Sequence, residues 1–141
     1  MKIHVVGGDS HYASWIPGAT ASSLKEADLV LFTGGEDVDP SYYGERIGKH
    51  TYTNPDRDYH EMEQFKIARI LGKRVLSICR GSQLICVASG GRLVQHVNNH
   101  AIYGTHSVTF KDGTEVNLTS THHQMMYPYM LKPDDYELIA W

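Results

Sequence analysis

The stretch Val75-Leu76-Ser77-Ile78-Cys79-Arg80-Gly81 decides the fold. Its aliphatic residues predict a short buried strand that ends at the cysteine, and the apolar residues 84–88 that follow predict a buried helix. A strand that turns sharply into a helix at a reactive residue is typical of a nucleophile elbow, which requires small residues two positions before and after the nucleophile. Ser77 and Gly81 occupy these two positions.

Cys79 is therefore a candidate nucleophile. A helix N-terminus beside its sulfur favours the thiolate, which is the reactive form. The amides after Cys79 point to where an oxyanion would develop. A buried structural cysteine at a strand end explains the local sequence equally well. Cys86 lies among apolar neighbours and is interpreted as a small core residue.

Short apolar runs alternate with helical segments on the N-terminal side of this stretch. This alternation predicts an α/β protein with a mostly parallel central sheet. An apolar stripe with an acidic first turn predicts the clearest helix. The expected elements are strands over 2–6 and 28–32, a short helix over 12–16, a helical turn over 22–27, a loop over 36–56 and a helix over 58–71 ending at Gly72.

The last third of the chain differs from the rest. Residues 106–110, 115–118 and 136–140 are expected to form strands. The segment Lys111-Asp112-Gly113-Thr114 is a hairpin signal between the first two. We find no repeat and no linker, so a single domain over residues 1–141 is expected.

Composition excludes several classes of function. The formal net charge is -3 and no Lys/Arg run occurs, which disfavours a protein that binds nucleic acid by neutralising phosphates. No apolar stretch approaches the roughly 18 residues of a membrane-spanning helix. Two cysteines make no disulfide framework, and the N-terminus does not resemble a signal peptide, so a cytoplasmic location is expected.

Two glycines follow the strand expected over 28–32. Gly34 and Gly35 allow the backbone to approach a ligand closely at the carboxyl edge of the sheet, although an ordinary turn explains them too. The acidic residues Glu36, Asp37 and Asp39 crowd one short loop without a recognisable metal-ligand spacing. We therefore do not expect a metal there.

Adjacent histidines, His122 and His123, follow a predicted strand and are candidates for a base or a substrate contact. The chain has nine histidines, and the spacing of His96 and His100 fits one helix face, so a zinc-binding protein is an alternative. No HExxH or CxxC motif supports zinc, and it remains the weaker hypothesis. Neither a metal nor a cofactor is expected.

An ordered set of segments resembles the class I glutamine amidotransferases, closest to their γ-glutamyl hydrolase-like (peptidase C26) branch. The resemblance spans roughly residues 28–141. The matching segments are residues 33–40, Asp56-Arg57-Asp58 with Glu61, residues 78–84, Ala88-Ser89-Gly90-Gly91 and His122-His123-Gln124.

This resemblance implies a three-layer, flavodoxin-like sandwich and a cysteine-dependent hydrolysis of a γ-glutamyl amide. Cys79 would attack the γ-carbonyl of glutamine or another γ-glutamyl small molecule and form a thioester, which water would cleave. The released amine or ammonia would leave or pass to a partner synthetase. The implied site residues are Cys79, the oxyanion-binding backbone amides of Gly35 and Arg80, and the substrate-binding residues Gly34, Gln83 and His123.

The chain departs from the family pattern in three ways. Ser77 replaces the glycine with which the elbow usually begins. A strand-helix unit usual in the family is not recognisable after the first strand. The family's catalytic base and its orienting acid lie in a C-terminal His-Pro-Glu segment, and this tripeptide does not occur in the 141 residues.

The third departure leaves three alternatives. The chain is a shortened product, His122 or His123 substitutes for the base, or the domain binds a ligand or partner without turnover. Loss of one triad member typically reduces the rate by several orders of magnitude. A shortened domain would also expose sheet surface, so a tendency to form a homo-oligomer is expected.

Overall fold

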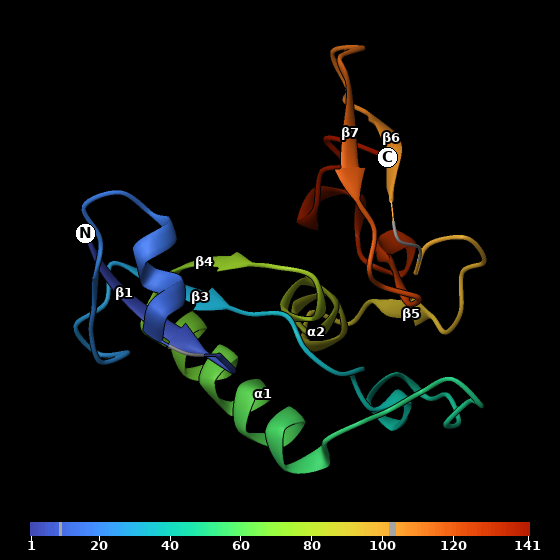
Figure 1. Cartoon of the computed structure of the whole chain (residues 1–141). Helices are drawn as coiled ribbons and strands as arrows, with labels where there is room; N and C mark the ends of the chain where they lie inside the picture. Colours follow the sequence, from blue (N-terminus) through green and yellow to red (C-terminus); the bar gives the residue numbers. More distant parts are fainter. Residues whose placement is uncertain (9, 102–103) are drawn as a thin grey trace.

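Four parallel strands form the central sheet of the computed structural model, which describes residues 1–8, 10–101 and 104–141. The predicted α/β class and the parallel sheet are confirmed. Figure 1 shows the sheet beside a smaller part built from the last third of the chain. The strand order is β2-β1-β3-β4, with β1 over Lys2–Val6, β2 over Thr20–Ala21, β3 over Leu29–Phe32 and β4 over Arg74–Ser77.

The register of the sheet places the ends of three strands side by side. Val6 pairs with Phe32, and Phe32 pairs with Ser77. The loops that follow β3 and β4 therefore start at the same edge. This edge carries the glycines of residues 34–35 and the cysteine of the elbow, as expected for the carboxyl end of a parallel sheet.

Different helices pack on the two faces of the sheet. Alternation along β3 turns Phe32 towards α1 (Pro55–Ile70) and α2 (Arg80–Ala88), where it packs with Phe65 and Leu84. Leu31 turns to the opposite face and packs near the short 3₁₀ helix η1 (Ser10–Trp15). The short helix expected over residues 12–16 thus forms, in 3₁₀ geometry.

Both main helices begin earlier than expected. Asn54 caps α1 by accepting a hydrogen bond from the Arg57 amide at 3.2 Å, and Pro55 occupies the first helical position. The helix therefore starts three residues before Asp58. Helix α2 starts at Arg80, directly after Cys79, rather than at residue 84. The expected loop over 36–56 contains a further 3₁₀ helix, η2 (Pro40–Tyr43).

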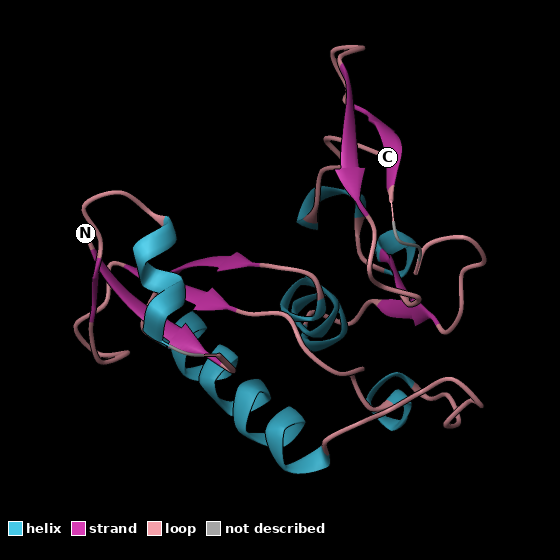
Figure 2. Ribbon diagram, in the orientation of Figure 1, coloured by secondary structure: helices cyan, strands magenta, loops and turns pink. Residues whose placement is uncertain are grey.

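The chain from residue 92 onwards forms two small antiparallel ladders (Figure 2). The expected hairpin is confirmed as β6 (Thr105–Thr109) paired with β7 (Glu115–Thr119). The sequence did not predict the second ladder, because its strands are only three residues long. These are β5 (Arg92–Val94) and β8 (Met125–Tyr127), followed by the 3₁₀ helices η3 (Pro128–Met130) and η4 (Pro133–Asp135).

The strand predicted over residues 136–140 is wrong. Its ladder pairing is limited to a single bridge between Ala140 and Phe110, beside which Trp141 exchanges backbone hydrogen bonds with Thr109 at the end of β6. The preceding residues are occupied by η4, so no regular ladder forms. Within the described residues, no helix has the length and apolar character needed to span a membrane.

Gly81 fixes the contact between α2 and β3. A Cβ at this position would lie 2.6 Å from the Phe32 carbonyl oxygen. We expect Gly81→Ala to lower the free energy of unfolding by about 1–3 kcal/mol, because backbone must move apart to admit the methyl group. Urea denaturation followed by circular dichroism measures this loss.

Gly48→Ala is the matched control, since its Cβ would meet only the Thr51 hydroxyl, at 3.3 Å. It should change the free energy of unfolding by less than about 0.5 kcal/mol. Equal losses in the two variants would show that helix packing against β3 does not depend on this glycine.

Candidate active site

Cys79 occupies a strained turn between β4 and α2. Its φ of 51° and ψ of -114° lie outside the ordinary regions for a residue with a side chain. Such backbone strain concentrates at functional sites, where the surrounding fold holds it. The thiol is exposed, whereas Cys86 is buried, as its apolar neighbours predicted. The alternative of a buried structural cysteine at position 79 is therefore wrong.

Serine is accommodated at the first position of the elbow. The Ser82 hydroxyl, in the first turn of α2, donates a hydrogen bond to the Ser77 hydroxyl at 3.0 Å. This bond connects the end of β4 to the start of α2 across the turn. The replacement of glycine by Ser77 therefore leaves the strand-turn-helix geometry intact.

The glycine loop after β3 lies against the elbow. A Cβ on Gly34 would lie 3.7 Å from the Cys79 Cβ, so the two backbones approach closely. Gly35 has a φ of 154°, and a Cβ there would lie 2.1 Å from an Arg57 guanidinium nitrogen. Among the described residues, neither the Gly35 nor the Arg80 amide has a hydrogen-bond acceptor. Both N–H groups are thus available to a ligand.

Arg57 holds this glycine loop in place. Its guanidinium donates to the Gly34 carbonyl at 2.9 Å and to Glu61 at 2.7 Å, and it also pairs with Glu36. Sequence reasoning assigned no role to this side chain. The signal was present in the spacing of Arg57 and Glu61, which are four residues apart on one helix face.

The Arg80 side chain points away from the site that its backbone borders. It is buried between two carboxylates, pairing with Asp58 at 2.5 Å and with Glu61. Burial raises the pKa of Asp58, although the Asp39 amide and Arg80 favour its charged form. Helix α1 and the start of α2 are therefore joined by a buried ionic network.

Two histidines near the elbow have different partners. His122 Nδ1–H donates to the Gln124 carbonyl at 2.8 Å, so the lone pair of the neutral ring is on Nε2. His123 Nε2–H donates to Asp37 at 3.0 Å, and its Nδ1 lies 3.4 Å from the Nδ1 of His96. The sequence did not predict the pairing of Asp37 with His123, because the two are 86 residues apart.

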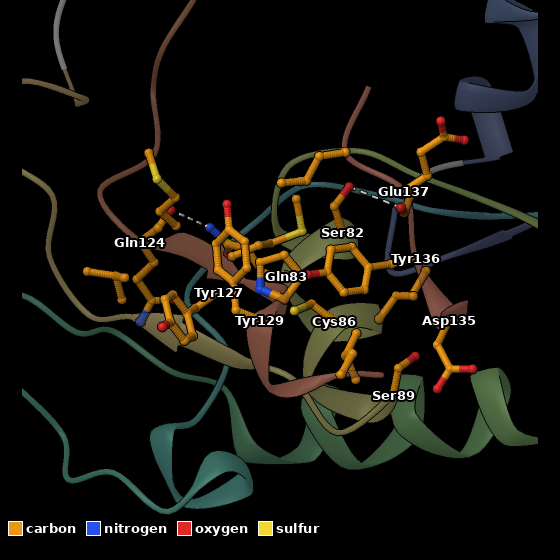
Figure 3. A pocket seen from close by; sticks show the side chains of 18 of the residues that line it. Ser82, Gln83, Cys86, Ser89, Gln124, Tyr127, Tyr129, Asp135, Tyr136 and Glu137 are labelled. Carbon is orange, nitrogen blue, oxygen red and sulfur yellow. Dashed lines mark hydrogen bonds between the residues drawn. The ribbon is translucent and has the colours of Figure 1, made fainter. Parts of the chain in front are cut away.

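Cys79 borders two openings. A polar cleft of about 790 Å³ is lined by Gly34, Gly35, Cys79, Gln83 and His123, five of the six predicted site residues. A second opening of about 1060 Å³ lies over α2, and Figure 3 shows it with Gln83 donating to the Gln124 carbonyl at 2.9 Å. Cys79, Gln83 and His122 line both spaces.

The acidic residues of the loop after β3 have separate partners. Glu36 pairs with Arg57, Asp37 with His123, and Asp39 caps η2 by accepting from the Ser41 amide at 2.8 Å. In the part of the chain that the structure describes, no three or more His, Cys, Asp or Glu side chains are arranged to hold a metal ion.

Comparison with known proteins agrees with this geometry. The family model described as Peptidase C26 matches residues 16–129, which is most of the chain. The chain belongs to the Peptidase C26 family. The elbow, the glycine loop and the acidic residues of α1 all lie within the matched residues.

Relatives agree with this membership, and a solved structure shares the fold. The chain is 43% identical over 76 residues to the glutamine amidotransferase-like protein YvdE of Lactococcus lactis, covering 53% of this chain and 32% of that one. It is 30% identical over 125 residues to protein NtpR of Enterococcus hirae, covering 85% and 51%. It spans at most about half of these relatives. A glutamine amidotransferase structure from Methylobacillus flagellatus shares the fold, with a TM-score of 0.58 at 14% identity, covering 89% of this chain and 55% of that one.

The buried network predicts a large effect for Arg80. Arg80→Met leaves Asp58 buried without a cation, whereas Glu61 keeps Arg57, and we expect it to lower the free energy of unfolding by about 3–5 kcal/mol at pH 7. Removal of the cation raises the folded-state pKa of Asp58 further. A carboxyl whose pKa is raised by folding binds protons on folding, so the variant regains stability as the pH falls from about 7 towards 5.

Lys66→Met is the control, because Lys66 pairs with Glu63 at 2.5 Å with its side chain 65% exposed. It should lower the free energy of unfolding far less than Arg80→Met does, and this small loss should change little over the same pH range. Denaturant titrations at several pH values measure both variants. A pH-independent loss in Arg80→Met would refute the ionic explanation.

Proposed function

We propose that the protein hydrolyses a γ-glutamyl amide, with Cys79 as the nucleophile. The observation that carries the proposal is the exposed thiol on a strained strand-helix turn, beside two backbone amides that have no acceptor among the residues described. The names of relatives as glutamine amidotransferase-like proteins support the same chemistry. Glutamine or another γ-glutamyl small molecule is the substrate.

In this reaction the Cys79 thiolate attacks the γ-carbonyl carbon and forms the C–S bond of a thioester. The Gly35 and Arg80 amides donate hydrogen bonds to the oxyanion. The C–N bond then breaks, and the departing nitrogen takes up the proton that came from the thiol. Water attacks the thioester, glutamate is released and the thiol is restored. Gly34, Gln83 and His123 line the glutamyl part of the cleft.

His122 is the base that suits this chain best. Its ring lines both spaces that Cys79 borders, and its Nε2 carries the free lone pair. In His123 both nitrogens are engaged, by Asp37 and by His96. An imidazole with one nitrogen fixed by a carbonyl and the other free is the usual arrangement of a general base.

A binding domain without turnover is the second candidate. No hydrogen bond joins the Cys79 thiol to an imidazole within the described residues, and the sequence contains no His-Pro-Glu segment. Such a domain would bind a γ-glutamyl ligand or a synthetase partner. Release of glutamate above background that disappears in Cys79→Ala would eliminate this alternative.

The proposal also covers the cellular location, domain form and self-association of the chain. Free thiols at Cys79 and Cys86 suit a reducing compartment such as the cytoplasm. We place residues 1–141 in one domain that has the three-layer, flavodoxin-like form of its class. The edge strand β4, with Leu76 45% exposed, supports self-association through the sheet.

Selective alkylation tests the nucleophile. A glutamine-analogue chloroketone should label Cys79 and leave Cys86 unmodified, because burial raises the pKa of the Cys86 thiol and keeps it protonated. Mass spectrometry of peptides from the folded protein locates the adduct. Cys86→Ala should label at the rate of the parent chain, whereas Cys79→Ala should not label.

Protection of Cys79 by glutamine tests whether the thiol lies in a glutamine-binding site or is only exposed to solvent. Excess glutamine should slow labelling by the chloroketone, but it should not slow labelling by iodoacetamide after the glutamine has been removed. Adducts on Cys86, or none on Cys79, would count against the proposed function. Labelling that glutamine does not slow would show that the thiol reacts without a glutamyl site.

Substitution of the two histidines tests the base. His122→Asn keeps a donor near the Gln124 carbonyl but removes Nε2, so we expect the rate of chloroketone labelling at neutral pH to fall about 100-fold. The difference from the parent should narrow at alkaline pH, where a thiol ionises without a base. His123→Asn is the comparison. A larger fall in the labelling rate in His123→Asn than in His122→Asn would make His123, rather than His122, the base.

A further inference from the structure

Aromatic side chains line the second opening beside Cys79. Three tyrosines face it from the last third of the chain, and Figure 3 shows them around the same space over α2. The ring centres of Tyr127 and Tyr129 are 5.2 Å apart, and those of Tyr129 and Tyr136 are 6.4 Å apart, both edge to face. This geometry can admit a further aromatic ring.

Apolar side chains complete this space. Ile85 of α2 and Met125, Met126 and Leu131 of the last third line it. Its charged lining residues among those described are two carboxylates, Asp135 and Glu137, and one cation, Arg69. The Arg69 guanidinium carbon lies 5.9 Å from the centre of the Phe65 ring. The walls therefore favour a neutral, flat, apolar group over an anionic one.

The polar cleft on the other side of Cys79 differs in its polar groups, although Tyr12, Trp15 and Tyr52 line it too. It contains the glycine loop, the carboxylates of Glu36 and Asp37, and several imidazoles. Because Cys79 borders both spaces, an amide whose carbonyl carbon lies at the sulfur can extend in both directions. The zwitterionic glutamyl part suits the polar cleft, which leaves the apolar opening for the nitrogen substituent.

We propose that the amine released at Cys79 carries an uncharged aromatic ring, which binds among Tyr127, Tyr129 and Tyr136. The substrate class is a γ-glutamyl arylalkylamide, and the inference rests on the proposed function. The thiolate displaces the arylalkylamine, whose nitrogen takes up the thiol proton as the C–N bond breaks. Water then releases glutamate.

Three substrates test the preference for a ring. γ-Glutamyl phenethylamide, γ-glutamyl ethylamide and γ-glutamyl glutamate place an aromatic, a small and an anionic group on the nitrogen. We expect kcat/KM for the phenethylamide to exceed that for the ethylamide about 10- to 100-fold, because binding removes the apolar surface of the phenyl group from water. The glutamate derivative should be the poorest of the three.

Matched tyrosine variants locate the ring. Tyr129 is 61% exposed, so Tyr129→Ala should fold, and it should lower kcat/KM for the phenethylamide about fivefold. Tyr129→Phe should retain the parent value. Tyr59→Ala is the control, since Tyr59 is 66% exposed on α1 and lines neither space.

Binding to Cys79→Ala separates this inference from the proposed function. Calorimetry should show the phenethylamide binding more tightly than the ethylamide, with the difference reduced about fivefold in Cys79→Ala/Tyr129→Ala. A preference in binding without turnover in the parent chain would sustain the aromatic site and refute the hydrolase. Equal turnover of both amides, with Cys79 labelled, would refute the aromatic site alone.

Discussion

Arg80 places a guanidinium between two buried carboxylates, and the position of the elbow depends on this contact. Asp58 and Glu61 lie on α1, whereas Arg80 is the first residue of α2 and directly follows Cys79. Three charges that are removed from water require one another, because an uncompensated buried charge is costly. The network therefore sets where α2 begins relative to α1, and with it the direction in which the preceding residue points.

The same carboxylate connects the elbow to the glycine loop. Glu61 accepts from Arg80 with one oxygen and from Arg57 with the other, and Arg57 in turn donates to the Gly34 carbonyl. The glycine loop supplies the Gly35 amide and the elbow supplies the Arg80 amide. Both segments are thus connected to the side chain of Glu61. A hydrogen-bond site for a developing negative charge works best when its donors are fixed before the reaction. Through Arg57 and Glu61, helix α1 orders both sides of the site.

Sequence reasoning predicted the features that depend on local pattern. The elbow, the parallel strands over residues 2–6 and 28–32, and the β6–β7 hairpin follow from apolar runs, small residues at a turn and a glycine-containing loop. It missed the two-residue β2 and the β5–β8 ladder, because such short strands carry no periodic signal. It also missed the pairing of Asp37 with His123, and the strand expected over residues 136–140 failed where tertiary contacts reach only its end.

The last third of the chain determines what surrounds the sulfur. The sheet and its two helices position Cys79, but they leave it exposed at the carboxyl edge. The segment from residue 120 onwards adds His123 on one side, the tyrosines on the other, and His122 between the two spaces. Gln83, at the base of both spaces, donates to the Gln124 carbonyl and so attaches this segment to α2. Because the carbonyl of Gln124 also accepts from His122, a single peptide group couples the order of the apolar opening to the tautomer of His122. The chemistry of this elbow is therefore shaped by residues that share no element with the cysteine.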